Sequence, residues 1–124
     1  MKTIIAGSRT ITDLAMIDKA VRASGFVITE LVEGGAQGVD SLAKIWAADI
    51  GLLITEFKAD WKIYGRGAGT IRNQKMAEYA DALIAVWDGE SRGTKNMIDP
   101  ANELKLKCFI YRLPIMNDES SVIL

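Results

Sequence analysis

Short apolar runs that each end at a glycine-rich turn constrain the fold of this chain more than any other feature. Four such turns occur: Gly7-Ser8-Arg9, Gly34-Gly35-Ala36-Gln37-Gly38-Val39-Asp40, Gly65-Arg66-Gly67-Ala68-Gly69-Thr70 and Asp88-Gly89-Glu90-Ser91-Arg92-Gly93-Thr94. The first, second and fourth join a strand-like run to a helix-like run. In an open parallel sheet such turns meet at the carboxyl edge of the strands, where ligands bind. Glycines let backbone N–H groups approach an anion, and a following helix adds a favourable dipole. The pattern therefore predicts a pocket for a nucleotide or phosphosugar.

Strand-like and helix-like segments alternate along the whole chain. The predicted strands are 3–6, 27–32, 52–57, 82–87 and 107–113, and the predicted helices are 13–25, 42–51, 70–79 and one that starts near Thr94. A long polar loop is expected at 58–69, and Pro100 predicts a kink or a late restart of the last helix with Asp99 as a local cap. This alternation predicts a three-layer α/β domain, with an open parallel sheet of about five strands and helices on both faces. Residues 1–114 form the domain, and 115–124 are a tail.

Composition excludes several function classes. The 15 lysines and arginines against 16 acids give a net charge of −1, so no global attraction to nucleic acid or anionic membrane is expected. The chain has no histidine and one cysteine, Cys108, which argues against a structural zinc site and excludes an internal disulfide. No metal or cofactor is predicted. A single cysteine, no signal-peptide pattern and no apolar run long enough for a bilayer predict a cytoplasmic protein.

Taken together, the turns resemble those of the SLOG superfamily, the Rossmann-like domains related to DprA/SMF proteins and to the LOG phosphoribohydrolases. The resemblance is strongest to the small stand-alone YspA/YpsA-related branch (DUF2493). It rests on Gly7-Ser8-Arg9, Gly34-Gly35-Ala36, Gly38-Val39-Asp40, Ala59-Asp60-Trp61, Tyr64-Gly65, Ala68-Gly69, Arg72-Asn73, Trp87-Asp88-Gly89, Ser91, Gly93-Thr94 and Met97-Ile98, and it spans residues 3 to 113. It implies a Rossmann-like fold, a site for a nucleotide or nucleotide derivative, and a homodimer.

One departure from the LOG enzymes bears on catalysis. Their Pro-Gly-Gly-x-Gly-Thr turn is followed, two residues later, by a catalytic glutamate. Here Lys95 and Asn96 follow Thr94, and Asp88-Gly89-Glu90 replaces the Pro-Gly-Gly start. Arg72 matches the family's arginine but precedes Asn73 rather than lysine. The resemblance therefore implies binding more strongly than hydrolysis, and no catalytic residue is assigned.

The candidate ligand-binding residues come from these turns. They are Gly7, Ser8, Arg9, Gly34, Gly35, Ala36, Gly38, Asp40, Trp61, Tyr64, Arg72, Asn73, Asp88, Gly89, Ser91, Gly93 and Thr94. Ser8 and Arg9 can hold a phosphate, the second turn can form an anion-binding nest, and Ser91 and Thr94 can bind a second anionic or hydroxyl group.

Several candidates keep two interpretations. Asp40 is either a ribose acceptor or a helix cap. Trp61 and Tyr64 either stack on a base or anchor their loop. Arg72 stands in a first helical turn, where a cation is unfavourable, so it is either placed for an anion or a solvated arginine.

Three functions follow from this pattern. The first is binding of a nucleotide or nucleotide-derived small molecule, as a sensor, sequestering or processing domain. The second is LOG-like hydrolysis of an N-glycosidic or phosphate bond. The third is DprA-like binding of single-stranded DNA along Lys58, Lys62, Arg66, Arg72 and Lys75, against which the slight acidic balance argues. A homodimer is expected from the resemblance and from apolar surface at Trp61, Tyr64 and the Tyr79 helix.

Overall fold

A single parallel sheet organises the molecule, which we describe from a computed structural model covering residues 1–113. Its strands are β1 (Lys2–Gly7), β2 (Glu30–Glu33), β3 (Leu53–Glu56), β4 (Ala82–Trp87) and β5 (Lys107–Arg112). They lie in the order β3-β2-β1-β4-β5, and every neighbouring pair is parallel. The predicted five-stranded parallel sheet is thus confirmed, and β1 lies at its centre.

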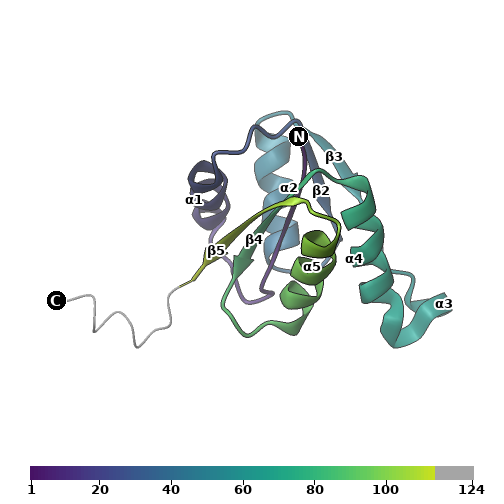
Figure 1. The fold of residues 1–124 in the computed structure, drawn as a ribbon. Coiled ribbons are helices and arrows are strands. Elements are labelled where there is room, and N and C mark those ends of the chain that lie inside the picture. Colours follow the sequence, from purple (N-terminus) through teal and green to yellow (C-terminus); the bar gives the residue numbers. More distant parts are fainter. Residues whose placement is uncertain (114–124) are drawn as a thin grey trace.

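Helices cover both faces of the sheet (Figure 1). They are α1 (Leu14–Ser24), α2 (Val39–Asp49), α3 (Trp61–Tyr64), α4 (Ala68–Tyr79) and α5 (Arg92–Glu103). Two apolar cores result, because alternate strand residues point to opposite faces. Ile4 and Leu83 belong to the core under α4 and α5, whereas Ile5 and Ile84 belong to the core under α1 and α2. β1 and β4 are therefore buried on both faces, as expected for the central strands of a three-layer α/β architecture.

Helix boundaries follow local chemistry where capping residues are present. The Asp13 carboxylate accepts from the Ala15 N–H at 2.9 Å, and Gly25 ends α1 with a φ of +69°, a left-handed conformation that suits glycine. The second strand begins at Glu30 rather than at residue 27, and the third is shorter than 52–57. Such shifts at element ends are common because terminal ladder bonds fray.

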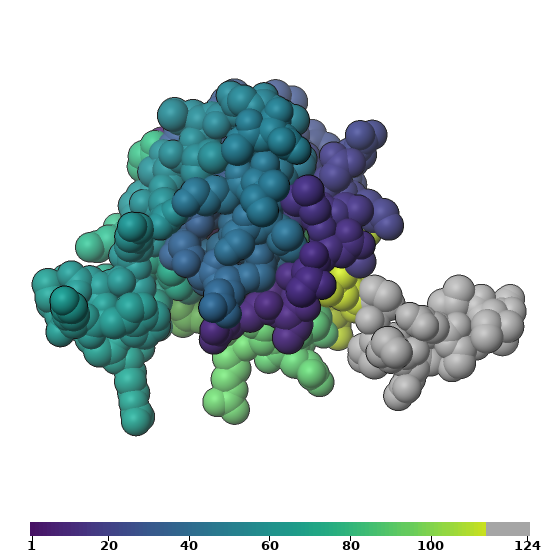
Figure 2. Space-filling view, turned by 180° about the vertical axis from the view of Figure 1, so that it is seen from behind, coloured from purple at the N-terminus to yellow at the C-terminus, as the bar shows by residue number. Residues whose placement is uncertain are grey.

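The segment 58–69 is not a continuous loop, contrary to the sequence prediction. It contains α3 and a 3-10 turn at Gly65–Gly67, and α4 starts at Ala68 instead of residue 70. The Asp60 carboxylate caps α3 by accepting from the Ile63 N–H at 3.2 Å. This short helix projects from the side of the domain (Figure 2).

Pro100 does not interrupt the last helix. α5 runs without a restart from Arg92 to Glu103, with Pro100 inside it, and Asp99 accepts from the Lys95 ammonium at 2.5 Å instead of capping a new helix. Proline removes one backbone hydrogen bond, and this loss is tolerated here because Pro100 lies in the last turn. Residues 1–113 contain no helix that is both long and apolar enough to span a bilayer. The predicted tail at 115–124 lies outside the described residues.

Candidate functional site

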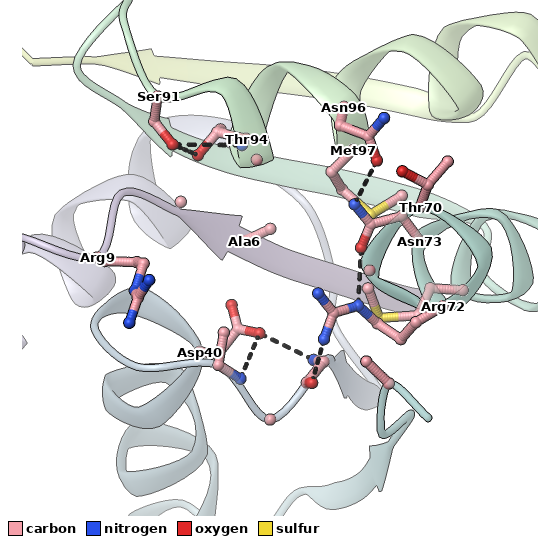
Figure 3. Close-up of a pocket in the computed structure, with 18 of the residues that line it drawn as sticks. Ala6, Arg9, Asp40, Thr70, Arg72, Asn73, Ser91, Thr94, Asn96 and Met97 are labelled. Carbon is pink, nitrogen blue, oxygen red and sulfur yellow. Dashed lines mark hydrogen bonds between the residues drawn. The ribbon is translucent and has the colours of Figure 1, made fainter. Parts of the chain in front are cut away.

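A pocket of about 820 Å³ opens at the carboxyl edge of the sheet. Its walls come from the end of β1, the turn between β2 and α2, the end of β3, the segment around α3, and the first turns of α4 and α5 (Figure 3). The predicted residues that line it are Gly7, Arg9, Gly34, Gly35, Ala36, Asp40, Trp61, Arg72, Asn73, Ser91, Gly93 and Thr94. Met76 and Met97 add apolar surface. The four glycine-rich turns therefore do meet around one cavity, while their contact with a ligand stays a prediction.

Five predicted residues do not line this pocket. Ser8 is buried, where its hydroxyl accepts from the Asp88 N–H at 3.4 Å. The Asp88 carboxylate accepts from the N–H groups of Glu90 and Ser91, each at 2.8 Å, which lowers its pKa. Gly38 packs on the backbone of Arg9, since a Cβ there would lie 2.6 Å from the Arg9 Cα atom.

The remaining two of these five residues are Tyr64, which lies at the surface, and Gly89, which lies beneath a side chain. Tyr64 is 45% exposed on α3, and Gly89 lies under the Arg112 guanidinium with a φ of +87°. Ser8, Gly38, Asp88 and Gly89 therefore have packing or turn-forming roles, whereas Tyr64 lies exposed on α3.

The turn between β2 and α2 directs its N–H groups at carboxylates of the chain itself. Gly34 and Ala36 both donate to Asp40 Oδ2, at 3.0 and 3.2 Å, and Gly35 donates to Glu33 Oε1 at 2.8 Å. Burial raises the pKa of Asp40, and the two N–H donors oppose that rise by stabilising the carboxylate. Asp40 therefore stabilises the turn before α2 and is not the helix cap, which is Gly38, whereas its contact with a ribose stays a prediction.

Arg72 ties α4 to the same turn. Its Nη1 atom donates to the Gly34 carbonyl oxygen, and its Nε atom donates to Asn73 Oδ1 at 2.9 Å. Asn73 Nδ2 in turn donates to Asn96 Oδ1 on α5 at 2.9 Å. The result is a chain of hydrogen bonds across the pocket, from the β2–α2 turn to α5 (Figure 3). Arg72 is thus not a solvated arginine, and it lies beyond the first turn of α4, which starts at Ala68, whereas its contact with an anion stays a prediction.

The start of α5 has a different arrangement. Ser91 Oγ caps the helix by accepting from the Thr94 N–H at 3.4 Å and from the Thr94 hydroxyl at 3.0 Å. The first N–H groups of a helix have no acceptor inside the helix, which here applies to Arg92 and Gly93. A Cβ added to Gly93 would meet no atom within 4 Å. Arg92 and Gly93 also line the pocket, so the start of α5 forms part of its wall.

Positive and aromatic side chains surround the pocket opening. Arg9 donates to Gln37 Oε1 at 3.3 Å and lines the pocket from the end of β1. Trp61 on α3 lines it while remaining 61% exposed. Lys58, Arg66 and Arg92 are further lining residues that sequence reasoning did not place in the site. An isolated surface cation carries no sequence signal of its own, because its position depends on the packing of α3 and α5.

Two glutamates at neighbouring strand ends were also missed. Glu33 is 1% exposed, and burial, with Glu56 and Asp40 nearby, raises its pKa to about 7. Glu56 lines the pocket and accepts from the Lys44 ammonium at 3.0 Å, which lowers its pKa. An acid as the last residue of an apolar strand, directly before Gly-Gly, was the available signal for Glu33. Among residues 1–113, no cluster of three or more His, Cys, Asp or Glu side chains is arranged to hold a metal ion.

Comparisons with known proteins show a family of related sequences and a similar fold. Residues 1–64 match the model of the YspA, cpYpsA-related SLOG family. The chain is 33% identical over 114 residues to the Gene 61 protein of Mycobacterium phage D29, an alignment that covers 82% of this chain and 89% of that protein. Among solved structures, it is similar to DNA processing protein A (DprA) from Streptococcus pneumoniae, with a TM-score of 0.74 and 16% identity. That alignment covers 94% of this chain and 52% of DprA, so this chain spans about half of that protein.

Proposed function

The chain belongs to the YspA, cpYpsA-related SLOG family, and we propose that its pocket binds a nucleotide or nucleotide-derived ligand. The phosphate lies at the start of α5 and the base lies toward Trp61. The observation that carries this proposal is that the backbone N–H groups of two pocket walls differ in their hydrogen bonding. The β2–α2 turn uses three of its N–H groups on Asp40 and Glu33, whereas α5 presents its first turn to the cavity.

An anion is stabilised at the α5 wall by several independent contributions. The helix dipole places partial positive charge there, and the N–H groups of Arg92 and Gly93 point toward the helix start. The guanidinium of Arg9 lines the same pocket and can pair with two phosphate oxygens. The first turn of α5 contains no acidic residue that would repel a phosphate.

The opposite end of the pocket suits a base. The exposed indole of Trp61 provides a flat apolar surface, and stacking of a base on an aromatic ring is worth about 1–3 kcal/mol. Asp40 and Asn73 also line the pocket and can supply polar contacts for a sugar. Binding is favoured over LOG-like hydrolysis because α5 carries Lys95 and Asn96 after Thr94, and Asn96 is engaged with Asn73.

The test combines detection of a retained ligand with a direct titration. Native mass spectrometry of the protein purified from cells weighs any bound nucleotide, and calorimetry measures the affinity for AMP, GMP, CMP and UMP. Arg9→Ala should weaken the best of these by about tenfold or more, because a charge-assisted hydrogen bond contributes about 1.5–3 kcal/mol. Arg22→Ala on exposed α1 is the matched control and should leave the affinity unchanged. Absence of both a retained nucleotide and measurable binding would overturn the proposal.

Single-stranded nucleic acid is a second candidate, which the surface around α3 favours. Trp61 and Tyr64 are exposed on this projecting helix, next to the cations Lys62 and Arg66. Exposed aromatic rings between positive charges are typical of single-strand binding surfaces. Binding of an oligonucleotide whose affinity falls steeply with salt would support this candidate, and binding of a mononucleotide with a weak dependence on salt would favour the first.

We further propose that the protein forms a homodimer through α3. Trp61, Ile63 and Tyr64 are 61%, 71% and 45% exposed, and together they make an apolar surface on one short helix. Ile63→Asp should then lower the mass measured by light scattering at high micromolar concentration. A monomeric mass for the unaltered protein would contradict the dimer.

A further inference from the structure

The side chain of Glu33 is buried at the carboxyl end of β2, and its two carboxyl oxygens differ in their hydrogen bonding. It is 1% exposed, and its Oε1 atom accepts from the Gly35 N–H at 2.8 Å. Its Oε2 atom is buried, and no group of residues 1–113 donates a hydrogen bond to it. A buried ionised carboxylate with an unpartnered oxygen is costly. The geometry is better explained if Oε2 carries a proton and itself donates.

The groups that face Glu33 make a second negative charge there unfavourable. Glu56 on the adjacent strand β3 and Asp40 on α2 are the neighbouring acids, and each raises the pKa of Glu33. Positive charges stand further along the same wall. The ammonium groups of Lys44 on α2 and Lys58 lie 3.0 and 4.0 Å from the Glu56 carboxylate, while Arg72 on α4 lowers the pKa of Asp40. The two lysines therefore stabilise the negative charge of Glu56. Of the two glutamates, Glu33 is the one that is protonated.

We propose that Glu33 and Glu56 form a carboxylic acid–carboxylate pair that holds one proton at the wall of the pocket, and that ligand binding is thereby linked to proton uptake. Glu33 Oε2 donates to Glu56, which satisfies the one oxygen that lacks a partner. Glu33 acts as a positioning residue because it contacts the Gly35 N–H, and Gly35 lines the pocket. The raised pKa of Glu33, about 7, agrees with a proton that is exchanged near neutrality.

Loss of that proton changes the charge that a ligand meets. Below neutral pH the Glu33–Glu56 pair carries one negative charge, and above it Glu33 adds a second charge behind Gly35. An anionic ligand is then repelled more strongly, because interactions between charges persist over several ångströms in a partly buried site. This consequence for binding rests on the proposed function, whereas the existence of the pair does not.

The pair is tested first without any ligand, by following the Gly35 amide in two-dimensional NMR spectra as pH changes. We expect its chemical shift to titrate with a midpoint near pH 7. Glu33→Gln should abolish this titration, and Glu56→Gln should lower its midpoint by about one unit, because a neighbouring like charge raises a carboxyl pKa by about that much or more. Glu103→Gln, at an exposed position near the end of α5, is the control and should change nothing. A midpoint below pH 5.5, or one that Glu56→Gln does not move, overturns the pair.

Linkage to ligand binding is tested with AMP as the probe, by calorimetry at pH 6 and pH 8. The comparison is the affinity of the unaltered protein divided by that of Glu33→Gln, so that titration of the AMP phosphate cancels. This ratio should be near one at pH 6 and should fall on the order of five- to tenfold at pH 8. An equal ratio at both pH values overturns the linkage. If AMP fails to bind either protein while Gly35 titrates as expected, the proposed function fails and the pair stands.

Discussion

Two glycine-rich turns face each other across the pocket, and they use their backbone N–H groups differently. In the turn between β2 and α2, Gly34 and Ala36 donate to Asp40 and Gly35 donates to Glu33. In the turn between β4 and α5, Asp88 accepts the N–H groups of Glu90 and Ser91, but Arg92 and Gly93 begin a helix whose first N–H groups have no helical acceptor. In the first turn, which we call closed, acidic side chains of the protein accept the N–H groups. In the second, which we call open, the first N–H groups of the helix have no such acceptor among residues 1–113.

The difference shows that glycine content alone does not identify an anion site. Gly34 is needed because the Arg72 guanidinium lies against it, and Gly35 because its φ is +73°. Neither requirement involves a ligand. Gly93 has a negative φ and open space around its Cβ position, so the fold itself does not require glycine there. Glycine that the fold does not need is the better indicator of close approach by a ligand.

Asp40→Ala should cause the largest effect, because it removes the acceptor of two N–H groups in the closed turn. An unpartnered buried donor costs about 1–3 kcal/mol, so we expect the free energy of unfolding to fall by about 3 kcal/mol. Urea unfolding followed by circular dichroism measures this loss. Asp40→Asn retains one side-chain oxygen and should lose less. A loss below about 1 kcal/mol for Asp40→Ala would show that water or another group completes the turn equally well.

The closed turn should also make stability depend on pH. The pKa of Glu33 is about 7 in the folded protein, above the usual value of 4.5, so the folded state holds a proton that the unfolded state has lost. The contribution of Glu33 to stability is therefore full below pH 4.5 and is lost as pH rises to about 7. The free energy of unfolding should fall by about 2–3 kcal/mol between pH 5 and pH 8. Glu33→Gln should flatten this curve, and an equally steep curve in that variant would assign the effect to another group.

Ser91→Ala probes the open turn and should have a smaller effect. Ser91 caps α5 through the Thr94 N–H, and loss of such a cap costs about 1 kcal/mol. Thermal unfolding monitored at the same pH for Ser91→Ala and Asp40→Ala compares the two turns directly. If the loss for Ser91→Ala equals that for Asp40→Ala, the two turns do not differ in the way their hydrogen bonds indicate.

Gly93→Ala should have the smallest effect on stability and the opposite sign. Alanine is favoured over glycine inside a helix, so the free energy of unfolding should rise by about 0.5–1 kcal/mol. If a phosphate contacts this backbone, the added methyl group should also weaken nucleotide binding in calorimetry. Gly67→Ala, at another glycine with open space around its Cβ position, is the matched control and should bind normally. Normal binding by Gly93→Ala would move the anion away from α5.

The sequence predicted the fold well because its signals are local. The run from Ala82 to Trp87 is apolar throughout and bounded by polar residues, and the strand has those bounds. Asp13 and Gly25 mark the two ends of α1 by their capping chemistry. The segment 58–69 was misjudged because its glycines and charges resemble a loop, whereas Asp60 provides a cap for only one turn of helix.

The candidate site was predicted less completely, because its chemistry depends on pairs of residues distant in the chain. The partners Arg72 and Gly34 are separated by 38 positions, and Asn73 and Asn96 by 23. Arg72 was expected at an anion on the basis of its own helix, and nothing near it in sequence indicated the Gly34 carbonyl group. Glu33 and Glu56 become neighbours only through the register of β2 and β3. Sequence patterns located the edge of the sheet but not the partners that each side chain finds there.

The central position of β1 has a consequence for how the chain folds. Thr3 pairs with Ala82 on β4, and the Lys2 N–H reaches Asp81 across 79 positions of sequence. At a synthesis rate of about 5–20 residues per second, β1 waits about 4–16 seconds for β4 after it leaves the ribosome. Until then one edge of its ladder is open to any extended segment nearby. Folding of the whole sheet, rather than of its first half, is therefore expected to protect this strand from aggregation in the cell.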